Sequence, residues 1–100
     1  MLTNEERISE LITRRRRQVL VHSVIYYKYD DNLISDDTWS KWAKELEDLQ
    51  RQYPEIAAKC VYAEAFDGFD GSSGAFLPLD DPWGNHKALY LLRLKEKGEV

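Results

Sequence analysis

The chain has 100 residues, of which 43% are hydrophobic and 32% charged, and this length and composition predict one globular domain, residues 1–100, with a single core. A net charge of −4 disfavours direct binding to nucleic acid, because phosphate contacts need clustered lysine and arginine side chains. The apolar runs are far shorter than the ~20 residues of a membrane span, and the N-terminus lacks a signal-peptide pattern, so we expect a cytoplasmic protein without membrane contact.

Cysteine and histidine are too few for a metal site or a disulfide framework. Cys60 is the single cysteine, and it lies in an apolar stretch where we expect a small buried side chain. His22 and His86 are the two histidines, and neither has zinc-ligand spacing or a nucleophile nearby in the sequence. We therefore predict no metal and no catalytic residues.

A long helix is predicted at the start of the chain. Thr3 and Glu6 have the spacing of a capping box, in which each side chain satisfies a free backbone amide of the first turn. Apolar residues then recur at helical spacing, and neither glycine nor proline occurs before Asp31. We expect one helix that ends near Tyr29.

Four consecutive arginines, Arg14, Arg15, Arg16 and Arg17, lie within this helix. Consecutive helical residues point in different directions, so the four side chains cannot form one contact patch. We favour a solvated helix face with partial pairing to nearby carboxylates. The alternative is a basic contact with an anion or a partner.

A polar turn and a second helix follow. Residues 30–32 are short polar residues that favour a turn, and Ser35 can cap a helix whose first turn carries Asp36 and Asp37. The apolar and aromatic residues that follow have a spacing of three and four: Trp39, Trp42, Leu46, Leu49 and Tyr53. This pattern favours a core position for both tryptophans, more strongly for Trp42.

The remainder predicts shorter elements. Pro54 suits the first position of a third helix, which we expect to run to about Phe66. The glycine-rich stretch 66–74 predicts a loop that two phenylalanines dock on the core. Residues 81–97 predict a last helix; residues 87–95 could also form a buried strand, but leucine, alanine, lysine and glutamate favour the helix. The predicted fold is mostly α, a long helical hairpin followed by one or two shorter helices and a Gly-rich loop.

Several motifs occur in a fixed order between residues 26 and 56. They are the aromatic pair YY at 26–27, the turn LISDDTWS at 33–40, the segment KELEDL at 44–49 and YPE at 53–55. In this order they resemble the small N-terminal helical subdomain, called Ia, of bacterial NAD-dependent DNA ligases. The similarity spans residues 3–57 if the preceding helix is included, whereas residues 58–100 form an extension that matches nothing in the ligase pattern.

The resemblance implies a nicotinamide site. In the ligases this subdomain closes over the nicotinamide mononucleotide half of NAD, and by position Tyr26, Asp36 and Trp39 are candidate contacts to the ring or the ribose. A flat aromatic side chain can stack on the cationic ring, and a carboxylate can pair with its charge. Tyr27 stands where the family commonly has histidine, and Ser40 where it has aspartate. We keep Tyr27 as a candidate ligand or partner contact.

Two functions remain open. The chain has no Lys-x-Asp-Gly sequence, whose lysine takes the adenylate in the ligases, so we do not expect an enzyme. Because two ligand positions differ, we favour a protein-interaction module, such as an accessory or inhibitory protein of a phage or other mobile element. The alternative is a module that binds NAD or nicotinamide mononucleotide, alone or in trans with a separately encoded adenylating enzyme.

Overall fold

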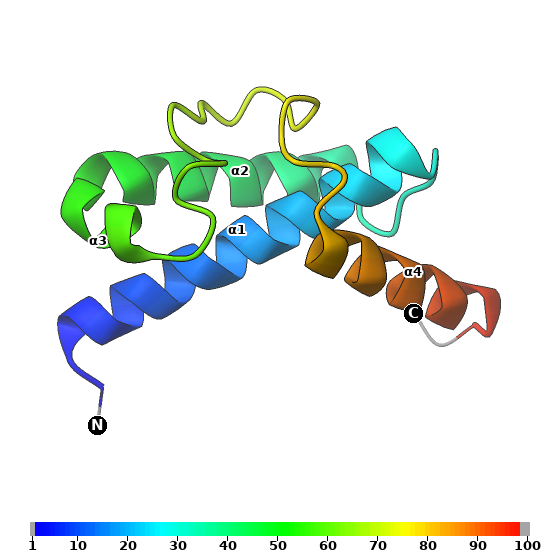
Figure 1. Ribbon diagram of the computed structural model, residues 1–100, viewed down its shortest axis with the longest axis horizontal. Coiled ribbons are helices and arrows are strands. Elements are labelled where there is room, and N and C mark those ends of the chain that lie inside the picture. Colours follow the sequence, from blue (N-terminus) through cyan, green and yellow to red (C-terminus); the bar gives the residue numbers. More distant parts are fainter. Residues whose placement is uncertain (1, 99–100) are drawn as a thin grey trace.

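The computed structural model describes residues 2–98, which form four α-helices and no strand (Figure 1). The helices are α1 (Asn4–Lys28), α2 (Asp36–Gln52), α3 (Pro54–Lys59) and α4 (Pro82–Glu96). The mostly α prediction, with a long hairpin followed by shorter helices and a Gly-rich loop, is confirmed, including the helical state of residues 87–95. None of the helices in the described part of the chain is both long and apolar enough to cross a membrane.

The predicted helix starts are present because their capping chemistry is local. The Thr3 hydroxyl accepts a hydrogen bond from the Glu6 amide at 3.1 Å, and the Thr3 amide donates to the Glu6 carboxylate. The Ser35 hydroxyl accepts from the Thr38 amide at 3.1 Å. Each bond satisfies an amide that has no partner inside the helix.

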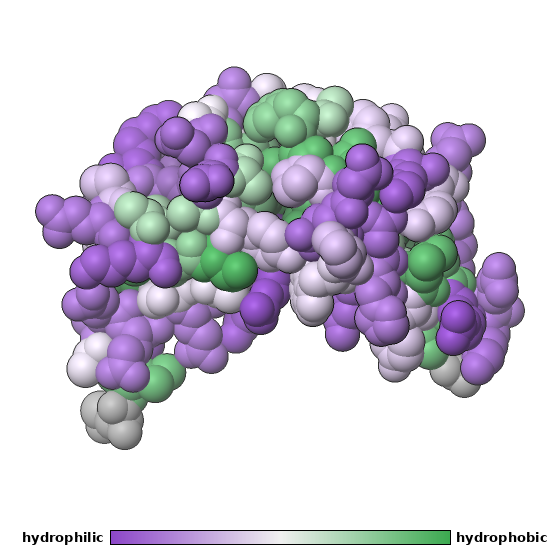
Figure 2. Space-filling view, viewed as in Figure 1, coloured by the Kyte–Doolittle hydropathy of each residue, from purple (hydrophilic) through white to green (hydrophobic). Residues whose placement is uncertain are grey.

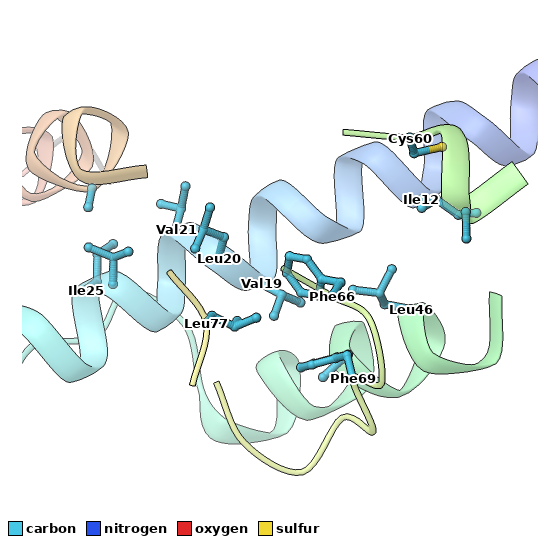
Figure 3. Packing of buried hydrophobic residues seen from close by; sticks show 14 residues of the cluster. Ile12, Val19, Leu20, Val21, Ile25, Leu46, Cys60, Phe66, Phe69 and Leu77 are labelled. Carbon is cyan, nitrogen blue, oxygen red and sulfur yellow. The ribbon is translucent and has the colours of Figure 1, made fainter. Parts of the chain in front are cut away.

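The central element is α1. In Figure 1, α2 lies alongside α1, α4 packs near the C-terminal part of α1, and the loop between α3 and α4 crosses α2. The C-terminal half of α1 is consequently buried on most sides, and its buried residues are Val19, Leu20, Val21, Ser23, Val24 and Ile25. Together with Leu46 of α2 and Phe66, Phe69 and Leu77 of the loop, they form the core (Figure 3).

Phe66 and Phe69 dock the glycine-rich loop on this core, as predicted. Both rings are buried and meet edge to face, with centroids 5.2 Å apart. Cys60 is also buried, as expected. Trp42 differs from the prediction, because it is only half-buried; its ring lies 5.7 Å from that of His22 and 5.9 Å from the Arg15 guanidinium.

Only part of the arginine run forms the predicted solvated face: Arg14 and Arg17 are exposed, whereas Arg16 is 2% exposed. Arg16 donates from Nε to Gln50 Oε1 at 2.9 Å, and from Nη1 to the carbonyls of Val61 at 3.0 Å and Cys60 at 3.3 Å. Burial lowers the pKa of Arg16, but an arginine guanidinium stays protonated in proteins. The prediction of a basic contact is therefore wrong for Arg16, whereas Arg15 shows the expected pairing, with Glu45 at 3.0 Å.

The same contacts explain why α3 is shorter than predicted. We expected a helix from Pro54 to about Phe66, but α3 ends at Lys59. The carbonyls of Cys60 and Val61 accept from Arg16, and Tyr62 has a φ of 65°, which no right-handed helix contains. A partner on α1, far away in the sequence, therefore overrides the local preference for helix.

We expect Arg16→Ala to lower the free energy of unfolding by about 2–4 kcal/mol, because the buried Cys60 carbonyl, the part-buried Val61 carbonyl and the Gln50 side-chain oxygen lose their donor. Arg14→Ala is the control, since Arg14 is exposed, and it should change stability by less than about 0.5 kcal/mol. Urea unfolding followed by circular dichroism measures both. Equal small losses in the two variants would contradict the structural role of Arg16.

Tyr62 generates a prediction about alkaline pH. Burial, with the hydrogen bond that its hydroxyl donates to Asp81 at 2.8 Å, raises the pKa of Tyr62 to about 12. An unfolded tyrosine titrates near pH ~10, so above that pH the unfolded chain loses this proton while the folded chain keeps it. The stabilisation is thus complete below pH ~10 and is lost as the pH rises through the folded pKa. In urea unfolding across this range, Tyr62→Phe should show a shallower fall in stability; identical slopes would refute the assignment.

Candidate functional site

A pocket of about 210 Å³ lies at the open end of the hairpin, where α1 ends and α2 begins. It is formed by the last turns of α1, the turn that follows and the first turns of α2. The lining residues are His22, Ser23, Tyr26, Tyr27, Asn32, Leu33, Ile34, Ser35, Asp36, Trp39 and Ser40. The pocket therefore depends on how the two helices meet.

Three aromatic side chains line this pocket. Tyr26 and Tyr27 are 53% and 45% exposed, and their rings meet edge to face with centroids 4.8 Å apart. The Tyr27 hydroxyl is 3.2 Å from the Ser73 hydroxyl of the long loop, which restrains this ring. Trp39 lines the pocket from α2 and packs partly on the core. Such a surface suits a flat ring, because aromatic rings prefer stacked or edge-to-face contacts.

Two buried polar atoms of the lining residues are unsatisfied. Ser23 is 1% exposed, and neither its Oγ nor Nδ1 of His22 has a hydrogen-bond partner among residues 2–98. A buried polar group without a partner costs about 1–3 kcal/mol, so a bound group that supplies the missing bonds is stabilised by them. These atoms distinguish the pocket from a surface depression.

The environment of His22 favours its neutral imidazole. Burial lowers the pKa of His22, because it penalises the protonated ring. A neutral imidazole carries one donor and one acceptor nitrogen, and the hydroxyl of Ser23 can donate or accept. The pair can therefore bind a group that offers both a donor and an acceptor.

The charge in this pocket is negative. Asp36 lies in the first turn of α2 and is exposed, whereas the lining contains neither lysine nor arginine. The N-terminus of α2 favours a negative charge at this position, so Asp36 also stabilises the helix. A neutral or cationic ring is favoured here over an anion.

The turn that forms one wall is held by α4. The Lys95 ammonium donates to Asp31 Oδ1 at 2.6 Å and to the Asn32 carbonyl at 3.2 Å. The hydrogen bond from Lys95 lowers the pKa of the Asp31 carboxyl. Asp30 has a φ of 51°, a left-handed conformation that short polar side chains tolerate, and it lies in the turn predicted at residues 30–32.

At Gly74 the long loop lies against two of the lining residues, Ser23 and Trp39. A Cβ at this position would lie 2.2 Å from Ser23 Oγ and 3.3 Å from Trp39 Cζ2. A side chain would therefore collide with two of the lining residues. Glycine allows the loop backbone to cover the unsatisfied hydroxyl of Ser23.

The structure places all four predicted contacts, Tyr26, Tyr27, Asp36 and Trp39, around one pocket. The basic residues Arg14, Arg15, Arg16 and Arg17 lie elsewhere on α1, and none of them lines it. His22 and Ser23 were missed as site residues. Their spacing was a usable signal, since they precede the two tyrosines by four residues and so share their helix face.

Comparisons with protein-family models, with curated proteins and with solved structures found no match to this chain. Among the described residues, no group of three or more histidine, cysteine, aspartate or glutamate side chains is arranged to hold a metal ion.

The contact between Gly74 and Ser23 can be tested with a double-mutant cycle. Gly74→Ala should destabilise the protein by about 1–3 kcal/mol, because the added methyl group meets the Ser23 side chain. Ser23→Gly removes both atoms that collide, so the two changes together should cost less than their sum by about 1 kcal/mol. Additive losses in urea unfolding would show that the loop does not lie against Ser23.

Proposed function

We propose that this chain is a small binding module that holds the nicotinamide ring of nicotinamide mononucleotide or NAD in the pocket at the end of the hairpin. The observation that carries the proposal is the pair of unsatisfied polar atoms, Ser23 Oγ and His22 Nδ1, beside aromatic rings. A pocket with apolar walls and a few convergent polar groups is the usual form of a small-molecule site.

The ligand fits the pocket chemically. Its pyridinium ring is flat and positively charged, so it can stack on Tyr26 or Trp39 and be attracted by Asp36. Its carboxamide carries donors and an acceptor, which match the Ser23 hydroxyl and the neutral imidazole of His22. Both atoms are buried in the free protein, so a ring that bonds to them would need a small opening of the pocket wall at His22 and Ser23.

The size and charge of the pocket limit what it can hold. A cavity of ~150 Å³ accommodates a benzene molecule, and drug-sized ligands need ~300–1,000 Å³. At about 210 Å³ the pocket admits one substituted ring, so the ribose and phosphate would extend outward. With no cation in the lining to bind the phosphate, we expect a weak affinity, in the high micromolar to millimolar range.

The resemblance to the Ia subdomain of NAD-dependent DNA ligases supports the same ligand. Tyr26, Asp36 and Trp39, the positions that this resemblance assigns to the ligand, all line the pocket. Tyr27 and Ser40, the two positions that depart from the ligase pattern, line it too. The module would bind the nucleotide alone, or present it to a separately encoded adenylating enzyme.

The test is a titration with nicotinamide mononucleotide in which binding is monitored by tryptophan fluorescence. Stacking near Trp39 should give saturable quenching, and Asp36→Asn should weaken binding about fivefold through the lost charge attraction. Asp37→Asn is the matched control, because Asp37 is a neighbouring carboxylate that does not line the pocket. It should leave the affinity unchanged within about twofold.

Related ligands make the test sharper. Nicotinic acid mononucleotide has a carboxylate in place of the carboxamide, so Asp36 should repel it and it should bind more weakly. Ser23→Ala should reduce this preference, because it removes one partner of the carboxamide. Absence of saturable quenching at several millimolar nucleotide, with a folded protein shown by circular dichroism, would overturn the proposal.

A second candidate function is the protein-interaction module favoured by the sequence. The observation behind it is the number of large apolar side chains that remain exposed, among them Phe76 at 58% and Tyr90 at 48%. Phe76 belongs to the long loop and lies near Phe69, with ring centroids 6.2 Å apart. Exposed aromatic residues are enriched at protein interfaces.

A further inference from the structure

A second concave surface lies between α1 and α4, and His22 is the residue that lines both this surface and the pocket at the end of the hairpin. The N-terminal part of α1 and α4 diverge in Figure 1, and the space-filling view in Figure 2 is hollowed between them along its lower edge. A groove of about 480 Å³ is lined there by both helices. We call it the α1–α4 groove. The lining residues on which the proposal depends are Arg14, Arg17, Val21, Trp83, Lys87 and Leu91.

The rim of this groove is basic. Arg14, Arg17 and Lys87 are exposed, and within residues 2–98 none of them forms an ion pair. Glu10 is the one carboxylate in the lining, so three cations stand against one anion. This local excess contrasts with the net charge of −4 of the whole chain. The groove therefore attracts a negatively charged partner.

The floor of the groove is apolar and contains an exposed tryptophan. Trp83 is 39% exposed, and the Arg17 guanidinium lies 5.2 Å from the centre of its ring. Leu91 is half-buried and Val21 is buried on α1. Tryptophan and arginine are the residues most enriched at the energetic centres of protein interfaces.

We propose that the α1–α4 groove binds an acidic amphipathic helix of a partner protein. Apolar side chains at positions i, i+3 or i+4, and i+7 of that helix would contact Trp83 and Leu91. Its flanking carboxylates would pair with Arg14, Arg17 and Lys87. The apolar floor between the two helices favours an apolar helix face, and the unpaired basic rim favours acidic residues beside that face.

A nucleic acid fits this surface less well. Single-stranded nucleic acid requires a longer basic track and successive aromatic residues on which its bases can stack. The groove offers three cations and one exposed tryptophan, whose ring already faces Arg17.

The inference is independent of the ligand pocket and can be tested separately. Arg14, Lys87 and Trp83 do not line the pocket, so variants at these positions leave its walls intact. In the experiment, peptides that bind the folded full chain are selected from a displayed library of random sequences. The peptides have about 16 residues, which is long enough for four helical turns. Enriched peptides should carry acidic residues together with apolar residues at helical spacing, and should become helical on binding.

The affinity of an enriched peptide is then measured by fluorescence anisotropy. Arg14→Glu with Lys87→Glu should weaken binding at least about tenfold. Trp83→Ala should weaken it by a similar factor, because the apolar floor of the groove loses its largest side chain. Lys41→Glu with Lys59→Glu is the control, since it makes the same charge change at exposed cations outside the groove. It should change the affinity by less than about threefold.

Three results would overturn the proposal. The first is that selection enriches no acidic helical peptides. The second is equal weakening by the groove variant and the control, which would indicate net charge alone. The third is tighter binding of an oligothymidylate of similar length, lost in the groove variant, which would make the surface a nucleic-acid site. Quenching by nicotinamide mononucleotide should be the same in the groove variant and the wild type, so failure here leaves the pocket unaffected.

Discussion

The structure depends on the burial of the Arg16 guanidinium. A buried cation without a carboxylate partner is tolerated only when its donors are satisfied, and here the acceptors are Gln50 and the carbonyls of Cys60 and Val61. Gln50 in turn donates from Nε2 to the Phe66 carbonyl at 3.1 Å. Arg16 of α1 is thereby linked to Gln50 of α2 and to both ends of the segment 60–66, which leads from α3 to the core. The course of the long loop follows from these bonds.

The residues that line the pocket at the end of the hairpin are supported by that loop and by α4. Gly74 lies against Ser23 and Trp39 because Phe66, Phe69 and Leu77 anchor the loop on either side of it. The start of α4 is fixed by Asp81, which accepts from Gly84 and Tyr62, and its end by the contacts of Lys95 with the turn. Residues 3–57 alone would lack all of these supports. The extension after residue 57, which has no counterpart in the ligase pattern, therefore supports the walls of the pocket, although the lining residues all lie between His22 and Ser40.

The features that the sequence predicted are those with short-range causes. The caps at Thr3 and Ser35 depend on residues three positions away, and the convergence of Tyr26, Asp36 and Trp39 depends on one tight turn. The end of α3 and the burial of Arg16 have a common cause that joins distant segments, so neither has a local signal. Likewise, the spacing of Ser23 and Tyr27 reveals a shared helix face, but the unsatisfied hydroxyl arises only because Gly74 covers it.

Charge separates the two proposed surfaces. Asp36 makes the pocket favourable for a cationic ring, while the unpaired cations of the α1–α4 groove favour an acidic partner. The lining of this pocket of about 210 Å³ would offer no cation to the phosphate of a nucleotide. Tight binding of the nucleotide would thus need a second protein to supply the missing contacts. If the pocket binds the nicotinamide ring and the α1–α4 groove binds a partner, the ligand-binding and the interaction hypotheses describe two surfaces of one protein and do not contradict each other.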